Sequence, residues 1–573
     1  MYIDIVPNRA SPPAVLLRES VRINGKITKR TLANLSALPD NCIEPLRAML
    51  RGEKLVTPSD AFDKISDQRH GGCDAIRVAM QKLGFPALLD PRRCRERDLV
   101  VAMVAMRLLN PKSKLATSRL WSQYTLPADL GIADADEKQL YAAMDWLLRR
   151  QERLEARLAA RHLKNGELAL YDLSSSYFEG VTCPLAKRGY SRDEKQGSLQ
   201  VNYGLMTDER GCPVAVSVYP GNTADSSTVA SQLSKLRDQF KLNNITLVGD
   251  RGMISQTQIN TIATLEGMAW ITALRSGKIK DLVAKGAVQL GLFDNTNLFE
   301  LTHEDFPNER LIACKNHELE KKRAHTREQL LRATETKLDQ VKQSVDNGKL
   351  RGAANIGLRV GKVIGKYKVA KHFITDISNN TFAFARHDDN IREEAAVDGI
   401  YIVRTSLPKQ ACSAADTVRN YKKLAQVERA FRSIKTTDIA IRRIHHRTED
   451  RVRAHILLCV LAYYVQWHLM QALRPMLFAD EMTDEQKAQR DPVSVARRSE
   501  AALRKASRKT LDDGSTVHSF RTLLCELDLI TRSTCRLRGP DPNAPTFDIT
   551  TSRSPTQQRA FDLLAAISLC PVG

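Results

Sequence analysis

The chain has 573 residues, 42% hydrophobic and 27% charged, which excludes a compositionally disordered protein and allows three or four domains with a sizeable core. Lys and Arg outnumber Asp and Glu by 87 to 66, giving a net charge of +21. This excess favours an acidic polymer, most commonly nucleic acid, as the partner, with a merely solvated basic surface as the alternative.

The cysteines and the most apolar run argue against two further classes. The eleven cysteines include no C-x-x-C pair and no Cys/His spacing typical of zinc sites, so we expect reduced thiols and a cytoplasmic protein. The N-terminus lacks an apolar signal region. The most apolar run, residues 456–465, is half the ~20 residues that a bilayer span needs, so it predicts a buried core helix and no membrane partner.

The first 165 residues change from strand to helix patterns. Asn24-Gly25 separates two short alternating runs, which predicts a β-hairpin in an N-terminal region 1–60. Apolar residues at helical spacing and many arginines follow, so region 61–165 is predicted to be a helical domain that binds DNA ends. A purely structural helical bundle would have the same pattern.

The remaining chain is predicted to hold an interrupted sheet domain. Between residues 166 and 275 the pattern reads β-β-β-α-β-α-β, which indicates an α/β fold with a central mixed sheet. Strand-like pieces and a long charged helix interrupt this pattern. We interpret them as an inserted domain, because a structureless loop of that length would be improbable. The expected ranges are an insertion domain at 276–400, the second part of the core at 401–477, and a polar, partly helical region at 478–573 with a Pro-rich, loosely ordered segment at 538–560.

Two aspartates follow apolar strand-like runs. Asp172 follows "LALY" and Asp250 follows "ITLVG". If these strands are neighbours, acidic residues at their ends lie close together in the crevice of a mixed sheet. For either aspartate taken alone, a strand cap or the start of a turn is the favoured interpretation.

A third carboxylate lies in the run "YKKLAQVERAFRSIK", which predicts one amphipathic helix from Tyr421 to Lys435. Glu428 is two helical turns from each end, so Tyr421, Glu428 and Lys435 share one stripe at the rim of the apolar face. Pairing of Glu428 with Arg432 at i+4 is the structural alternative, and a metal shared with the two aspartates is the functional one.

Three carboxylates suit two Mg²⁺ ions, which prefer oxygen ligands and promote phosphodiester chemistry. Ten Lys or Arg accompany four Asp or Glu between Tyr421 and His455. An acidic cluster in a basic setting is typical of metal-dependent chemistry on DNA or RNA.

Several ordered blocks resemble bacterial insertion-sequence transposases of the DDE class, in the superfamily marked by Y-x2-R-x3-E-x6-K around the catalytic glutamate. The blocks are "YDLSSSYFEG", "GYSRDEKQGSLQVNYGL", "ITLVGDRGMIS" and "YKKLAQVERAFRSIKT", within roughly 165–475. Tyr421, Glu428 and Lys435 match the signature, whereas Leu424 stands at its arginine position. Lys422 and Lys423 are therefore the candidates for a phosphate contact made there in relatives.

The resemblance implies an RNase H-like catalytic core and a division of roles. Asp172, Asp250 and Glu428 would be the catalytic metal ligands for two Mg²⁺ or Mn²⁺ ions. The implied DNA contacts are Tyr421, Lys422, Lys423, Arg432, Lys435 and Arg251. The implied partners are the element's terminal inverted repeats and target DNA, and we expect a homo-oligomer, a dimer, to bind them, because synapsis joins two ends.

Two other functions share this site. One is a catalytically inert DNA-binding regulator derived from a transposase, which the departure at Leu424 would fit. The other is a metal-dependent nuclease without strand transfer.

Overall fold

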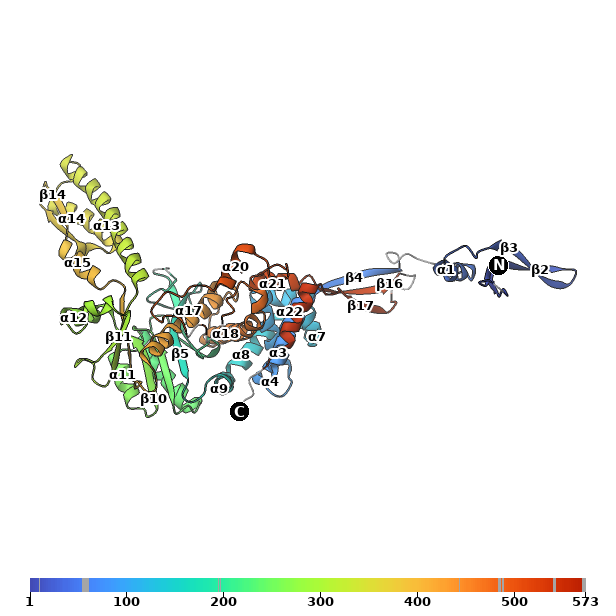
Figure 1. Ribbon diagram of the computed structural model, residues 1–573, viewed down its shortest axis with the longest axis horizontal. Helices are drawn as coiled ribbons and strands as arrows, with labels where there is room; N and C mark the ends of the chain where they lie inside the picture. The colour runs from blue at the N-terminus through green and yellow to red at the C-terminus, as the bar shows by residue number, and fades with distance from the viewer. Residues whose placement is uncertain are drawn as a thin grey trace. The chain divides into compact units, whose positions relative to one another are not determined.

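The computed structural model (Figure 1) describes the chain except for residues 10, 54–60, 194, 196, 443, 483–485, 487, 488, 539–542 and 569–573. It forms two compact units, one of residues 1–69 and 530–552 and one of residues 70–529 and 553–573. The smaller unit therefore combines segments from near both ends of the sequence.

Among its described residues, the smaller unit holds two antiparallel sheets and the helix α1. Its elements are β1 (Tyr2–Val6), β2 (Ala14–Ile23), β3 (Lys26–Asn34), α1 (Asp40–Leu50), β4 (Phe62–Arg69), β16 (Thr531–Leu537) and β17 (Thr546–Thr550). The β2–β3 hairpin is confirmed, and Asn24 and Gly25 turn with φ of 48° and 75°, as a two-residue turn of this kind requires. The predicted helical region 61–165 begins with strand β4, which pairs with β16, and its helices start at residue 71.

The larger unit is built on a nine-stranded mixed sheet, which confirms the predicted α/β class. Its strands are β5 (Leu168–Tyr177), β6 (Lys187–Arg188), β7 (Leu199–Thr207), β8 (Pro213–Pro220), β9 (Ile245–Gly249), β10 (Met268–Ala273), β11 (Leu298–Leu301), β12 (Arg310–Lys315) and β15 (Ile400–Thr405). Eight follow the order β11-β12-β15-β10-β9-β5-β7-β6, and β8 also pairs with β7.

The strands that carry the two predicted aspartates pair in parallel at the middle of the sheet. β5 runs parallel to β9, and β9 runs parallel to β10. β5 is buried over most of its length, as expected for a strand covered on both faces. In chain order, the crossover elements are η2 (Asp225–Thr228), α10 (Val229–Ser234), η3 (Lys235–Gln239) and α11 (Gln256–Ala263).

The helices that precede β5 in the chain pack together with α18 (Glu449–Ala472), which contacts α5, α8 and β8. These helices are α3 (Gly71–Lys82), α4 (Phe85–Leu89), α5 (Arg95–Leu109), α6 (Lys114–Leu120), η1 (Trp121–Gln123), α7 (Thr125–Asp129), α8 (Glu137–Leu148) and α9 (Gln151–His162). Residues 456–465 are all buried within α18, which confirms the predicted core helix. Within the described part of the chain, no helix has the length and apolarity needed to cross a bilayer.

The segment after β10 both extends the sheet and builds a core of its own. It comprises α12 (Ser276–Ala284), η4 (Leu290–Asp294), β11, β12, α13 (His317–Asp346), α14 (Ala353–Tyr367), η5 (Ala370–His372), β13 (Phe373–Ile377), β14 (Phe382–Arg386) and α15 (Asp388–Ala396). β11 and β12 join the main sheet through β15, whereas α13, α14, β13 and β14 enclose a separate apolar cluster. In Figure 1 these helices project beyond the sheet.

The end of the chain is more ordered than its composition predicts. After α18 come η7 (Arg474–Met476), α20 (Glu500–Arg508), α21 (Phe520–Leu527) and α22 (Pro555–Ala565). The expected loose segment 538–560 contains β17 and much of α22, so that prediction is wrong for its described residues. Ser554 and Gln557 form a reciprocal capping box, and Pro555 occupies the first helical turn, so polar residues start a helix here.

Candidate active site

The sheet brings the two predicted aspartates side by side. Tyr171 of β5 lies opposite Gly249 of β9, and each is followed by one of the aspartates. Asp250 follows its strand as expected. Asp172 lies inside β5 and not at its end, because the strand continues through three buried serines to Tyr177.

Glu428 approaches the same point from a helix. α17 (Leu424–Arg432) packs on β5, and its buried side chains are Val427, Ala430 and Phe431. Negative charge on both Asp250 and Glu428 acts on the carboxyl group of Asp172. Asp250 and Glu428 are exposed and Asp172 is half-buried, so the three carboxylates border solvent.

Burial and neighbouring charges change the acidity of Asp172. Loss of hydration is the main cause that raises the pKa of Asp172 from 3.8 to about 7, and repulsion from Asp250 and Glu428 adds to it. The backbone N–H of Leu173 and the charge of Arg192 oppose this shift but do not cancel it. An oxygen-only cluster with uncompensated negative charge fits Mg²⁺ or Mn²⁺.

The helix that carries the signature residues is interrupted. The structure divides the predicted single helix into α16 (Ala414–Lys422), α17 and the π-helical turn η6 (Ser433–Thr437), with a turn at Lys423. Tyr421 nevertheless points to the site, and its hydroxyl donates to Oδ1 of Asp250 across 3.3 Å. Burial and the neighbouring Asp250 raise the pKa of Tyr421, so its phenol stays protonated and can donate this hydrogen bond.

Lys435 is held by an ion pair that the sequence did not predict. Its Nζ lies 3.1 Å from Oδ1 of Asp193, and Arg442 pairs with the same oxygen. The Asp193 side chain is 1% exposed and its Oδ2 accepts the backbone N–H of Tyr177, so this carboxylate ties β5 to the segment after α17.

Arg192, next to Asp193, is a second residue missed by the sequence analysis. Its guanidinium pairs with Asp225, and its charge lowers the pKa of Asp172. Asp225 lies inside η2 and does not cap a helix with its side chain. Arg192 and Asp193 both lie in the block "GYSRDEKQG". The sequence does not indicate their role, because a charged cluster between two strands does not reveal which strand it faces.

The other predicted DNA contacts differ in their surroundings. Lys422 donates to the backbone oxygens of Val493 and Ser494 at 3.0 Å each, and Lys423 lies 2.7 Å from Glu209. Lys422 is thus used to hold the chain after α18, which does not support the expected phosphate contact. Arg251 and Arg432 are exposed, and Leu424 is half-buried beside the apolar face.

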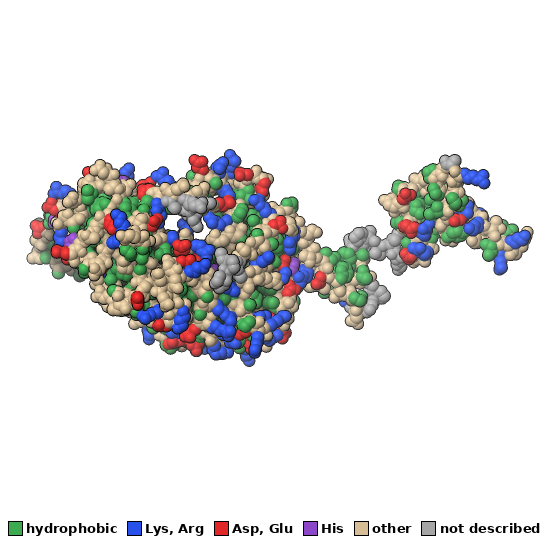
Figure 2. Space-filling model, turned by 60° about the horizontal axis from the view of Figure 1, so that its bottom comes forward, with side chains coloured by type: hydrophobic (Ala, Val, Ile, Leu, Met, Phe, Trp, Pro, Cys, Tyr) green, Lys and Arg blue, Asp and Glu red, His purple; other side chains and the backbone are tan. Residues whose placement is uncertain are grey.

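A small cavity opens beside Asp250. It has a volume of about 300 Å³, and Arg251, Tyr401, Tyr421 and Arg323 are among its lining residues. Two cationic and two phenolic side chains next to the carboxylates suit a phosphate and a base. Figure 2 shows Lys and Arg side chains among acidic ones on this unit's surface, where they gather at its lower edge.

Comparison with known proteins gives one family match. Residues 175–465, just over half of the chain, match the family model described as transposase DDE domain. The match includes Asp250 and Glu428 and begins three residues after Asp172.

The matching solved structures include a transposase complex. It is a piggyBac transposase synaptic complex with hairpin DNA, determined by cryo-electron microscopy. It has a TM-score of 0.34 and 8% identity, covering 85% of this chain and 89% of that one. None of the curated proteins matches.

Proposed function

The chain belongs to the family of transposase DDE domains, and from this premise we propose that it cuts the ends of a bacterial insertion sequence and joins them to target DNA. What supports the proposal is that Asp172 and Asp250 follow paired residues of β5 and β9, and that the charge of Glu428 on α17 acts on the carboxyl group of Asp172. These residues are the proposed catalytic metal ligands.

The topology of the sheet supports an RNase H-like core. Three antiparallel strands, β8, β7 and β5, are followed by β9 and β10, both parallel to β5. The proposed ligands lie on its first strand, after its fourth strand, and on a helix packed against the first. Strands β11, β12 and β15 extend this core from the inserted segment.

The three carboxylates would hold two Mg²⁺ or Mn²⁺ ions, which, when bound, activate an attacking water or 3′-hydroxyl and stabilise the leaving oxygen. Tyr421 orients Asp250 by donating a hydrogen bond from its hydroxyl to Oδ1. Arg192 keeps a positive charge near Asp172 without occupying the acidic cluster, because it is paired with Asp225. These groups would preorganise the ligands before DNA arrives.

Basic side chains around the carboxylates would hold the phosphates of the DNA. Arg251 is the best placed, since it is exposed, follows Asp250 and lines the adjacent cavity. Lys435 would contribute mainly by stabilising the local structure, because its ammonium group is already paired with Asp193. The helical segment 71–162 and the N-terminal hairpin are the proposed end-binding parts, and a dimer would bring two ends together.

The test is cleavage and strand transfer with the purified chain, Mg²⁺, and DNA from the flanks of its own coding region. We expect nicks at the ends of inverted repeats and joined products with a second duplex. Asp172→Asn and Glu428→Gln should lower both products at least 100-fold, because each removes a ligand charge. Asp238→Asn, an exposed carboxylate outside the site, is the matched control and should leave both unchanged.

The same assay separates the two other functions. Cleavage without joined products would indicate a metal-dependent nuclease. Repeat-specific binding without any cleavage in Mg²⁺ or Mn²⁺ would indicate an inert DNA-binding regulator. Equal cleavage by the parent chain and both ligand variants would contradict the proposed site.

A further inference from the structure

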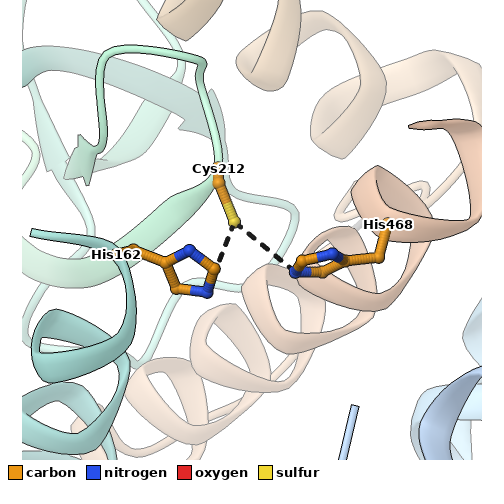
Figure 3. A group of neighbouring side chains, drawn as sticks. All are labelled: His162, Cys212 and His468. Carbon is orange, nitrogen blue, oxygen red and sulfur yellow. Dashed lines mark hydrogen bonds between the residues drawn. The ribbon is translucent and has the colours of Figure 1, made fainter. Parts of the chain in front are cut away.

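A histidine–cysteine cluster lies outside the carboxylate site (Figure 3). His162 is the last residue of α9, Cys212 lies in the turn between β7 and β8, and His468 lies near the end of α18. One ligand atom from each lies within 4.8 Å of the other two. Sγ of Cys212 is 3.9 Å from Nε2 of both histidines, and both rings are directed toward the sulfur.

The residue types and their burial suit a soft or borderline metal ion. Cys212 is buried and both histidines are half-buried, so the cluster is largely screened from solvent. On binding, the ion would replace the proton of the Cys212 thiol. Two imidazoles and a thiolate are ligands that Zn²⁺ prefers.

The turn that presents Cys212 is fixed before any ion binds. Oδ1 of Asp208 accepts the backbone N–H groups of Arg210 and Cys212, each at 2.9 Å. Oδ2 of Asp208 pairs with the guanidinium of Arg210 at 2.7 Å, and this guanidinium lies beside His162. Gly211 supplies the left-handed conformation of the turn, with φ of 86°.

The cluster joins parts of the larger unit that are far apart in sequence. Cys212 is 50 residues from His162 and 256 from His468. The same turn abuts α17, since a Cβ at Gly211 would lie 2.8 Å from Cβ of Gln426, two residues before Glu428. An ion here would therefore fasten α9 and α18 to the turn that supports the helix carrying Glu428.

We propose that His162, Cys212 and His468 bind one Zn²⁺ ion as a structural site, distinct from the carboxylate site. Three protein ligands leave a fourth position of the tetrahedron, which a water molecule would fill. Without an ion, the Tyr464 hydroxyl lies 3.2 Å from Nε2 of His162, and this contact would be given up when the nitrogen coordinates the metal. Asp208 acts as a positioning residue for Cys212 through the backbone hydrogen bond. This proposal does not depend on the proposed function.

The test measures the metal directly in the full chain. Purified protein should contain about one zinc per chain. After exchange with Co²⁺ it should show a thiolate-to-cobalt charge-transfer band, which carboxylate ligands cannot produce. Cys212→Ser should abolish the band, and His468→Gln should lower Co²⁺ affinity at least tenfold, with folding checked by circular dichroism. Should Cys212→Ser fail to fold, His468→Gln alone decides.

Two controls make the result specific. Cys183→Ser alters another buried cysteine and should leave the band unchanged. Asp172→Asn alters the carboxylate site and should also leave it unchanged. A chain without bound zinc that yields no charge-transfer band on Co²⁺ addition would overturn the proposal, as would a band that survives in folded Cys212→Ser. In either case the three side chains form an ordinary packed cluster.

Discussion

At the scale of the residue, Asp172 is the most informative side chain. Its pKa is raised to about 7 mainly by burial, whereas a carboxyl in an unfolded chain titrates near 3.8. Between these values the folded protein binds the proton more strongly than the unfolded protein does. The free energy of unfolding of the metal-free protein therefore falls as the pH rises from about 4 to about 7.

Replacing this carboxyl should reveal that cost. We expect Asp172→Asn to raise the free energy of unfolding by about 2 kcal/mol at pH 8 in the absence of metal, with the gain shrinking toward pH 4. Denaturant melts of both proteins at the two pH values measure it. A variant that is less stable than the parent at pH 8 would contradict the electrostatic account.

Asp193 should behave in the opposite way. Its removal leaves Lys435 and Arg442 without their shared partner, and these side chains are 11% and 23% exposed. We expect Asp193→Ala to lower the free energy of unfolding by about 3 kcal/mol. Asp389→Ala breaks an exposed pair with Arg392 and should cost less than about 0.5 kcal/mol. Similar losses in both variants would show that the Asp193 pair is not special.

At the scale of the element, alternating and apolar runs predicted strands β5, β7, β8, β9 and β10 correctly, whereas the β5–β9 pairing on which the site depends was only a condition and is supplied by the structure. The same reasoning missed the breaks between α16, α17 and η6. Helical periodicity describes an ideal helix. In the structure, the side-chain amide of Gln466 donates hydrogen bonds to the side chains of Ser433 and Asp438, which supports the wider turn at η6. Tertiary contacts of this kind leave no local pattern.

The contact between the β7–β8 turn and α17 makes an element-scale prediction. Gly211→Ala would force a left-handed conformation on alanine and push its Cβ against Gln426, whereas Gly514→Ala meets only the first problem, with φ of 81° and open space. We expect a loss of about 1 kcal/mol for Gly514→Ala and at least twice that for Gly211→Ala. Thermal melts compare them, and equal losses would show that the turn does not support α17.

At the scale of the whole molecule, long-range pairing set the limit of the sequence analysis. β4 pairs with β16 across more than 450 residues, and the His162–Cys212–His468 cluster draws on three distant segments. Neither has a spacing that a scan of the sequence can find. The net charge, in contrast, follows directly from the composition.

That charge predicts how the whole chain binds DNA. If phosphates are held by several Lys and Arg side chains, affinity should fall at least 100-fold between 50 and 200 mM salt. Fluorescence anisotropy with a labelled duplex measures it, and Arg251→Ala should weaken binding and reduce the slope of log K against log salt by about 1. An affinity that hardly changes with salt would argue against a phosphate-based interface.

The central claim is that three distant carboxylates form one divalent-metal site. Electron paramagnetic resonance of Mn²⁺ with the full chain and DNA tests it most directly, because bound Mn²⁺ loses its free-ion signal. The account predicts about two bound ions per chain, loss of that binding in Asp172→Asn and Glu428→Gln, and no loss in Asp238→Asn. Unchanged Mn²⁺ binding in both ligand variants would contradict it.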